Sequence, residues 1–295
     1  MLLGAAGRIP GDWRNITSEL LAEVADEGFG ALNIVVQDPT SMSTQDAARL
    51  KAMFEEAGVL IGQTNGAYGG GLVSPDPTER EAAIEFTRLM CGLTARLGSP
   101  NTYLRPGSLN PNGPWQPHPG NRSDEVFERL VDSSRKFCRA AEDEGVMVAV
   151  EGGAVSPLYS ARRVRDFIKA VGSPALGFNQ DPVNFVGSLE DAYDTTHFLA
   201  EFFDLTGEFT LGAHAKDFTV IDQLMVRFEE AEIGSGMLDH VAFLQGMQRV
   251  CPHGHVLIEH LPSDRYADAV VEYRKYASLA GIEWDNTTGE NHGES

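Results

Sequence analysis

A repeated unit organises this sequence: an amphipathic helical segment, then a glycine, then a short apolar strand. Glycine suits the left-handed residue just past a helix C-terminus, and such positions are held by Gly28, Gly58, Gly98, Gly145, Gly172 and Gly207. The strands predicted after these glycines are 31–37, 59–65, 101–106, 146–152, 174–181 and 209–216, with two more at the N-terminal LLGAAG and at 255–260. The repeat therefore predicts eight strands that alternate with helices.

The helical segments carry start signals, and the strands have the composition of a buried sheet. Ser43 followed by Asp46 fits a capping box, and Asp76 before a proline fits an N-cap. Ser123 opens a helix that we predict to end at Glu144. Most of the strands are continuous apolar runs without alternation, which is typical of a parallel sheet covered on both faces.

Eight strand–helix units in 295 residues predict an α/β fold, a (β/α)8 TIM barrel, which typically needs about 250 residues. An open doubly wound sheet is the alternative, but no glycine-rich dinucleotide or phosphate loop follows the first strand. GAYGGG at 66–71 lacks the spacing of such a loop, and we interpret it as a flexible loop. We predict one catalytic domain over 1–284 and a disordered polar tail over 285–295.

Charge and cysteine content restrict the partners and the location. The chain has 43 acidic and 23 basic residues, a net charge of −20, which disfavours nucleic acid and anionic membranes as partners. Cys91, Cys138 and Cys251 form no C-x-x-C pair, so we expect free thiols in a reducing compartment. The N-terminus does not resemble a signal peptide, and no apolar stretch approaches the roughly 20 residues of a membrane span. These features favour a cytoplasmic protein.

Ionisable residues end four consecutive predicted strands, where a barrel of this kind has its active site. The fifth strand ends in Glu151, the sixth in Asp181, the seventh in His214 and Lys216, and the eighth in Glu259. Each acid alone is more often a solvated or capping residue, but three carboxylates gathered in one barrel mouth would repel each other unless a cation lay between them. We therefore predict that Glu151, Asp181, His214 and Glu259 bind one divalent cation. These donors suit Mn²⁺ best, with Mg²⁺, Co²⁺ and Zn²⁺ as alternatives.

These segments resemble the sugar phosphate isomerase/epimerase family, the xylose-isomerase-like TIM barrels, which includes ketose 3-epimerases, inosose dehydratases and hydroxypyruvate isomerases. That family typically shows a Glu ending strand 5, Asp-x-x-His after strand 6, His-x-Lys-Asp after strand 7, a Gly-x-Gly loop and a Glu ending strand 8. Here the matching segments are Glu151, DPVN at 181–184, HAKD at 214–217, IGSGMLD at 233–239 and Glu259.

Two departures from the family pattern leave the substrate open. Asn184 replaces a histidine that contacts substrate and metal in many relatives, and the resemblance therefore assigns Asn184 to substrate binding. Pro157 stands where the ketose 3-epimerases carry a second glutamate. Both changes disfavour a standard ketose 3-epimerase.

The rest of the substrate pocket is expected to come from strand ends and loops. His214 and Lys216 share one face of their strand, and we expect Lys216, one pleat further out, to hold a substrate oxygen. Arg105 is predicted to bind a substrate oxygen or to form a salt bridge at the rim. The long loop over 106–122 is either functional or mobile, and its Trp115 and His118 would close over a sugar ring or pack within the loop.

Two further polar residues lie near these strand ends. Gln63, near the end of the third strand with Asn65, is expected to contact substrate hydroxyls. His260 adjoins Glu259 but falls on the opposite face of the strand, so we expect a structural role for it.

The resemblance implies a metal-dependent isomerase or epimerase for a sugar or other polyhydroxy carbonyl compound. An enediolate would be stabilised by the cation, with Glu151 and Glu259 as catalytic acid and base. The alternative is a lyase on the same site that dehydrates an inosose or eliminates from a 3-oxo-glycoside. A related abasic-site endonuclease is disfavoured by the net charge of −20. We expect a small sugar-like substrate and a homo-oligomer, with a small partner subunit as an alternative.

Overall fold

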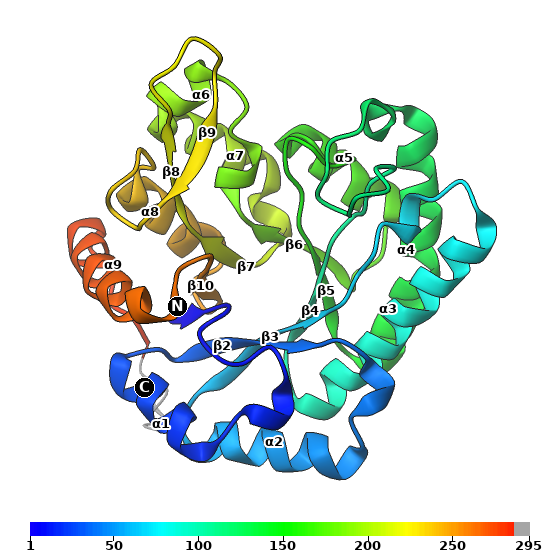
Figure 1. The fold of residues 1–295 in the computed structure, drawn as a ribbon, viewed down its shortest axis with the longest axis horizontal. Coiled ribbons are helices and arrows are strands. Elements are labelled where there is room, and N and C mark those ends of the chain that lie inside the picture. Colours follow the sequence, from blue (N-terminus) through cyan, green and yellow to red (C-terminus); the bar gives the residue numbers. More distant parts are fainter. Residues whose placement is uncertain (286–295) are drawn as a thin grey trace, which may run out of the picture.

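Eight parallel strands form a closed barrel in this computed structural model, which describes residues 1–285 (Figure 1). Around the barrel the strands follow the order β1-β10-β7-β6-β5-β4-β3-β2. Their bounds are β1 (Leu2–Ala5), β2 (Ala31–Val36), β3 (Leu60–Gly66), β4 (Asn101–Leu104), β5 (Met147–Val150), β6 (Leu176–Gln180), β7 (Thr210–Ala215) and β10 (His255–Ile258). The TIM barrel predicted from the sequence is therefore confirmed.

Helices surround the strands, and one β-hairpin projects from the barrel (Figure 1). The helices are α1 (Ser18–Glu27), α2 (Thr44–Glu56), α3 (Pro77–Leu97), α4 (Asp124–Glu144), α5 (Ala161–Val171), α6 (Leu189–Tyr193), α7 (Thr195–Thr206), α8 (His240–Val250) and α9 (Tyr266–Ala280). Single 3₁₀ turns lie at Trp13–Asn15, Pro39–Ser41, Gly71–Val73, Pro119–Arg122, Pro182–Phe185, Gly207–Phe209 and Ser263–Arg265. The hairpin consists of β8 (Asp217–Val220) and β9 (Phe228–Ala231), which pair antiparallel directly after β7.

The predicted helix caps are present. The side chain of Ser43 accepts from the backbone N–H of Asp46 at 3.1 Å, and that of Asp76 accepts from Thr78 at 2.7 Å. Gly207 differs from the expectation, because its φ of −57° is not left-handed. A side chain there would meet Val250, since an added Cβ would lie 2.7 Å from its Cγ1. Close packing therefore explains this glycine.

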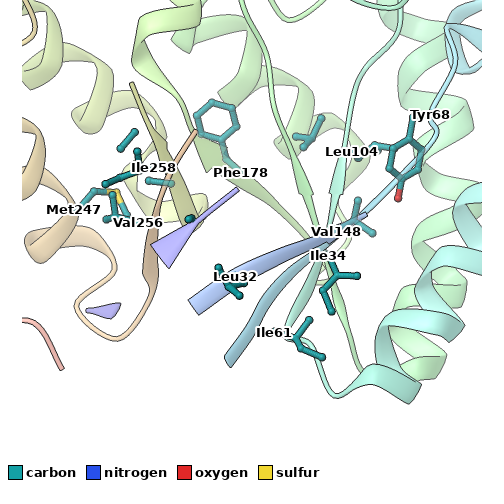
Figure 2. Close-up of a cluster of buried hydrophobic side chains, with 14 of the residues drawn as sticks. Leu32, Ile34, Ile61, Tyr68, Leu104, Val148, Phe178, Met247, Val256 and Ile258 are labelled. Atoms are coloured by element: carbon teal, nitrogen blue, oxygen red, sulfur yellow. The ribbon is translucent and has the colours of Figure 1, made fainter. Parts of the chain in front are cut away.

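The apolar core lies between the barrel and its helices. Leu32 and Ile34 of β2 are fully buried on the helix side, whereas Asn33 and Val35, which alternate with them, face into the barrel and line its cavity. Figure 2 shows this core with side chains from several barrel strands and Met247 of α8. The interior of the barrel is polar where the strands carry buried amides, which the apolar character of the runs did not predict.

The first and last described residues, Met1 and Asp285, lie close together. Asp285, where the predicted tail begins, places Oδ2 2.6 Å from the amino nitrogen of Met1. The remainder of that predicted tail, 286–295, lies outside the described residues. The three cysteines are free, as expected. Within residues 1–285 no helix combines the length and the hydropathy that a membrane crossing requires.

Candidate active site

A cavity of about 470 Å³ lies at the carboxyl ends of the barrel strands. Its volume falls within the roughly 300–1,000 Å³ of small-molecule sites. Several of the predicted site residues line it: Arg105, Trp115, Glu151, Asn184, His214, Lys216 and Glu259. Asp181 is fully buried directly beside this lining and contacts Lys216. The strand-end residues therefore meet in one place.

Three of the candidate metal ligands, Glu151, Asp181 and Glu259, lie around the fourth, the imidazole of His214. Its Nδ1 lies 3.0 Å from Glu151 Oε2 and 2.9 Å from Glu259 Oε2. Glu151, Asp181 and His214 each offer a ligand atom, and these atoms lie within 4.8 Å of one another. All four side chains are buried. Carboxylates that lie this close together and are shielded from water attract a cation strongly.

Two polar atoms of this cluster indicate that the residues fit a divalent cation. Asp181 Oδ1 and His214 Nδ1 are buried and have no hydrogen-bond partner within residues 1–285. The carboxylates near Nδ1 are close to it but not aligned for a hydrogen bond. A buried polar group left without a partner costs about 1–3 kcal/mol. Coordination of a cation by these oxygen and nitrogen atoms would remove that cost.

Lys216 lines the cavity, and its ammonium lies between two carboxylates. Its Nζ lies 2.9 Å from Asp181 Oδ2 and 2.8 Å from Glu259 Oε1, and the side chain is buried. Burial lowers the pKa of this ammonium, but Asp181 and Glu259 outweigh it and hold the pKa well above its ordinary value. Lys216 is thus a fixed positive charge between two candidate ligands, and its contact with a substrate oxygen stays a prediction.

The pKa values of the two carboxyl groups that flank Lys216 shift in opposite directions. Burial raises the pKa of Asp181 to about 8, although the Lys216 ammonium opposes that rise. Burial also acts on Glu259, but His214 and Lys216 outweigh it and hold its pKa well below the usual range. Glu259 is therefore ionised at neutral pH.

Asn184 connects two of the candidate ligands. It lies in the 3₁₀ turn Pro182–Phe185, directly after β6, and lines the cavity. Its Nδ2 donates to Glu151 Oε1 at 2.8 Å and to Asp181 Oδ2 at 2.7 Å. The amide thereby fixes the spacing of these two carboxylates.

The loop over 106–122 covers the mouth of the cavity through Trp115. Side chains tie this loop to itself: Ser108 donates to the carbonyl of Gln116 at 2.7 Å, and Asn110 donates to that of Pro117 at 2.8 Å. Arg105, which precedes the loop, lines the cavity, and its Nε is buried without a hydrogen-bond partner within residues 1–285. Trp115 and Arg105 are therefore available to a ligand.

We expect Trp115→Ala to raise KM by about tenfold, because an aromatic contact is worth about 0.5–1.5 kcal/mol beyond its buried area. Metal content and kcat should change little, since Trp115 touches none of the candidate ligands. Steady-state kinetics on the identified substrate would measure this. Trp284→Ala, which removes an indole beside Tyr273, is the matched control. An unchanged KM for Trp115→Ala would exclude Trp115 from substrate binding.

His118 and Gln63 are not among the residues that line the cavity, and the substrate contacts expected of them stay predictions. His118 caps the 3₁₀ turn Pro119–Arg122, where its Nδ1 accepts from the backbone N–H of Gly120 at 3.1 Å. Gln63 is fully buried, and its Oε1 lies 2.9 Å from His214 Nε2. Asn65, two residues further along β3, lines the cavity instead. Residues 63 and 65 share a face, but the cavity ends one pleat above Gln63.

His260 lines the cavity, whereas the sequence placed it on the opposite face with a structural role. It is the one non-glycine residue of 1–285 with a positive φ, 60°, and this left-handed turn after β10 brings its ring to the mouth. Its Nδ1 lies 2.7 Å from Glu230 Oε1 of β9, and Nε2 lies 3.6 Å from Glu259 Oε1. Strained backbone of this kind is common at active sites. Strand alternation could not reveal it, because the strand has already ended.

Tyr103 of β4 is a further site residue, and it was not among those predicted from the sequence. Its ring stacks on His214 with centroids 5.4 Å apart, and its hydroxyl donates to Glu151 Oε1 at 3.2 Å. It therefore supports two candidate ligands at once. Inward-facing residues just before a strand end, such as Tyr103 in NTYLRP, are the signal that could have identified it.

Asp217, the last residue of HAKD, anchors the segment that contains the Gly-x-Gly sequence. Its carboxylate accepts from the backbone N–H groups of Phe218, Gly234, Gly236 and Leu238 and lies 3.1 Å from His240 Nε2. An added Cβ on Gly236 would lie 2.2 Å from Asp217 Oδ1, which explains this glycine. The buried carboxylate thus holds the hairpin and the loop after it beside Lys216.

Comparison with known proteins agrees with this architecture. The family model described as a xylose isomerase-like TIM barrel matches residues 21–277. None of the curated proteins compared with the sequence matches it. Solved structures that resemble the chain include the 3-keto-D-glucoside 4-epimerase from E. coli (TM-score 0.69, 18% identity, 93% of this chain and 99% of that one covered).

Two other similar structures cover 95% of this chain. The D-psicose 3-epimerase from Clostridium cellulolyticum H10, solved with D-tagatose, has a TM-score of 0.71 at 18% identity, with 98% of that chain covered. A xylose isomerase-like TIM barrel protein from Mycobacterium smegmatis, in complex with magnesium, has a TM-score of 0.71 at 14% identity, with 96% covered. At these identities the likeness shows the fold.

Proposed function

This chain belongs to the xylose isomerase-like TIM barrel family, and we propose that it is a divalent-metal-dependent isomerase or epimerase for a sugar or other polyhydroxy carbonyl compound. The observation that carries the proposal is a buried cluster: ligand atoms of Glu151, Asp181 and His214 lie within 4.8 Å of one another, and Glu259 Oε2 lies 2.9 Å from His214 Nδ1. The similarity to sugar epimerases of the same fold supports it.

Three carboxylates and one imidazole favour Mn²⁺, with Mg²⁺, Co²⁺ and Zn²⁺ as alternatives. When bound, the cation would supply a Lewis acid that stabilises negative charge on substrate oxygens. The neighbour solved with magnesium supports a cation in this fold. In this chain, Asn184 and Tyr103 would hold the ligand Glu151 in place through the hydrogen bonds described above.

Glu259 and Glu151 each place a carboxylate oxygen near His214 Nδ1, at 2.9 and 3.0 Å, and these two groups would act as the proton-transfer pair. Glu259, kept ionised by His214 and Lys216, would remove the proton from the carbon beside the substrate carbonyl, which leaves an enediolate. Return of a proton to the same carbon from the other face gives an epimer, and return to the former carbonyl carbon gives an isomer. Arg105 would hold an outer substrate oxygen.

The second candidate function is a lyase on the same site. We retain it because Asn184 and Pro157 depart from the pattern of the ketose 3-epimerases. From the same enediolate, the electron pair would expel a leaving group on the next carbon in place of reprotonation. The substrate would then be an inosose or a 3-oxo-glycoside.

We expect the protein purified in the presence of Mn²⁺ to carry about one divalent ion per chain, because ligand atoms of Glu151, Asp181 and His214 lie within 4.8 Å of one another. EDTA should abolish turnover, and added Mn²⁺ should restore it. Elemental analysis and kinetics on the same samples would measure both. Full turnover in a protein shown to be free of metal would contradict the proposal.

A panel of substrates separates the two candidates. Ketohexoses, inososes, hydroxypyruvate and 3-oxo-glucosides would be incubated with the Mn²⁺-loaded protein in D₂O and followed by NMR. Epimerisation or isomerisation introduces deuterium at the reacting carbon without loss of a group. Elimination releases water or an aglycone.

A further inference from the structure

A layer of buried amides lies directly beneath the candidate metal site, inside the barrel. Gln63 is at its centre, fully buried, and it contacts Asn33 of β2 and Asn101 of β4, the two neighbouring strands, and Asn179 of β6. Gln63 Oε1 lies 2.9 Å from His214 Nε2, on the side of the ring away from the carboxylates. Gln63 itself does not line the cavity.

Two independent contacts fix the orientation of these amides. Asn101 Nδ2 lies 3.3 Å from the backbone carbonyl of Gly62, which can only accept, so Asn101 presents Oδ1 to Gln63. Asn179 Nδ2 lies 2.7 Å from Glu151 Oε2, and an ionised carboxylate also only accepts, so Asn179 likewise presents Oδ1. Both asparagines therefore need a donor from Gln63.

Gln63 has one such donor, its Nε2, which lies 3.2 Å from Asn101 Oδ1 and 3.3 Å from Asn179 Oδ1. Its Oε1 must then face His214, and it also accepts from Asn33 Nδ2 at 3.2 Å. An amide oxygen cannot donate, so the hydrogen between Gln63 and His214 belongs to His214 Nε2. The other nitrogen, Nδ1, is the one that lies between Glu151 and Glu259 without a hydrogen-bond partner within residues 1–285.

We infer that Gln63 is a positioning residue that keeps the hydrogen of His214 on Nε2 and so leaves the Nδ1 lone pair free to bind the cation. The inference rests on the proposed function, because it needs a cation at this site. The physical reason is general: the hydrogen bond at one imidazole nitrogen decides which nitrogen can act as ligand. Reversal of the Gln63 amide would set oxygen against the oxygens of Asn101 and Asn179 and put its NH₂ against His214 Nε2.

The test compares Mn²⁺ binding by wild type, Gln63→Leu and Gln180→Leu in equilibrium dialysis. Gln180 is an equally buried glutamine that binds Thr206 and Thr210, away from the cavity, so its variant controls for the loss of a buried amide. Loss of a hydrogen bond to a metal-ligating histidine typically weakens metal affinity by 10–100-fold, and we expect about that for Gln63→Leu. Gln180→Leu should stay within about twofold of wild type, because it leaves the ligands and their hydrogen bonds intact.

A second measurement identifies which nitrogen of the His214 ring is protonated and which binds the metal. In wild type saturated with diamagnetic Zn²⁺, ¹⁵N NMR should show His214 with a protonated Nε2 and a metal-bound Nδ1. This experiment needs no variant, so a metal-bound Nε2 would overturn the inference even if Gln63→Leu does not fold. A metal-bound Nε2, or Mn²⁺ affinity equal to wild type in a folded Gln63→Leu, would overturn the inference and leave the proposed function standing. Wild type that binds neither cation would overturn both.

Discussion

Replacing Glu259 with Gln should lower turnover by about 10²-fold or more, as removal of a general acid or base typically does. Glutamine keeps the size of the side chain and an oxygen that Lys216 Nζ, 2.8 Å away, can still bond, so the cavity should keep its shape. It cannot accept a proton from a carbon acid. Exchange of the substrate α-proton with D₂O, followed by NMR at saturating Mn²⁺ with metal content measured, is the readout.

Asp181→Asn is the control for this experiment, because we assign Asp181 to ligation alone. It should lose metal affinity, and added Mn²⁺ should restore part of its turnover. Glu259→Gln should instead keep its metal and stay slow at every Mn²⁺ concentration. Near-normal α-proton exchange in metal-loaded Glu259→Gln would remove Glu259 from acid–base chemistry and leave it as a ligand.

The barrel and the convergence of its charged strand ends were predictable from the sequence because they depend on local patterns. Buried parallel strands have a distinct composition, and their carboxyl ends meet by topology. Glu151, Asp181, His214 and Glu259 follow from these two facts, without knowledge of any contact between strands.

The depth at which each site residue lies, and the residues that it contacts, could not be predicted from the sequence in the same way. The period of a strand predicted that Gln63 and Asn65 share a face of β3. It could not predict that Asn65 lines the cavity and that Gln63 does not. Lys216 was expected one pleat beyond His214, but the sequence did not identify Asp181 and Glu259 as the negative charges that its buried ammonium needs. His260 reaches the mouth through a left-handed backbone turn that no periodic pattern encodes.

Asp217→Ala should lower the free energy of unfolding by about 3–5 kcal/mol, because it leaves several buried donors without their acceptor. Four backbone N–H groups and His240 Nε2 converge on this carboxylate. Denaturant unfolding at pH 7 would measure the change. Asp239→Ala, in the same segment, removes only an N-cap contact to Ala242 and one hydroxyl contact, and should cost about 0.5–2 kcal/mol.

The same carboxylate predicts a dependence on pH. Burial raises the pKa of Asp217, but the hydrogen bond from His240 and the backbone donors outweigh it and leave the pKa below its ordinary value of 3.8. A lowered folded-state pKa stabilises the fold above the unfolded value, and this stability is lost as the pH falls through the folded one. The difference between wild type and Asp217→Ala should therefore be full at pH 7 and shrink below about pH 4. A difference that equals that of Asp239→Ala at pH 7, or that grows in acid, would contradict the anchoring role of Asp217.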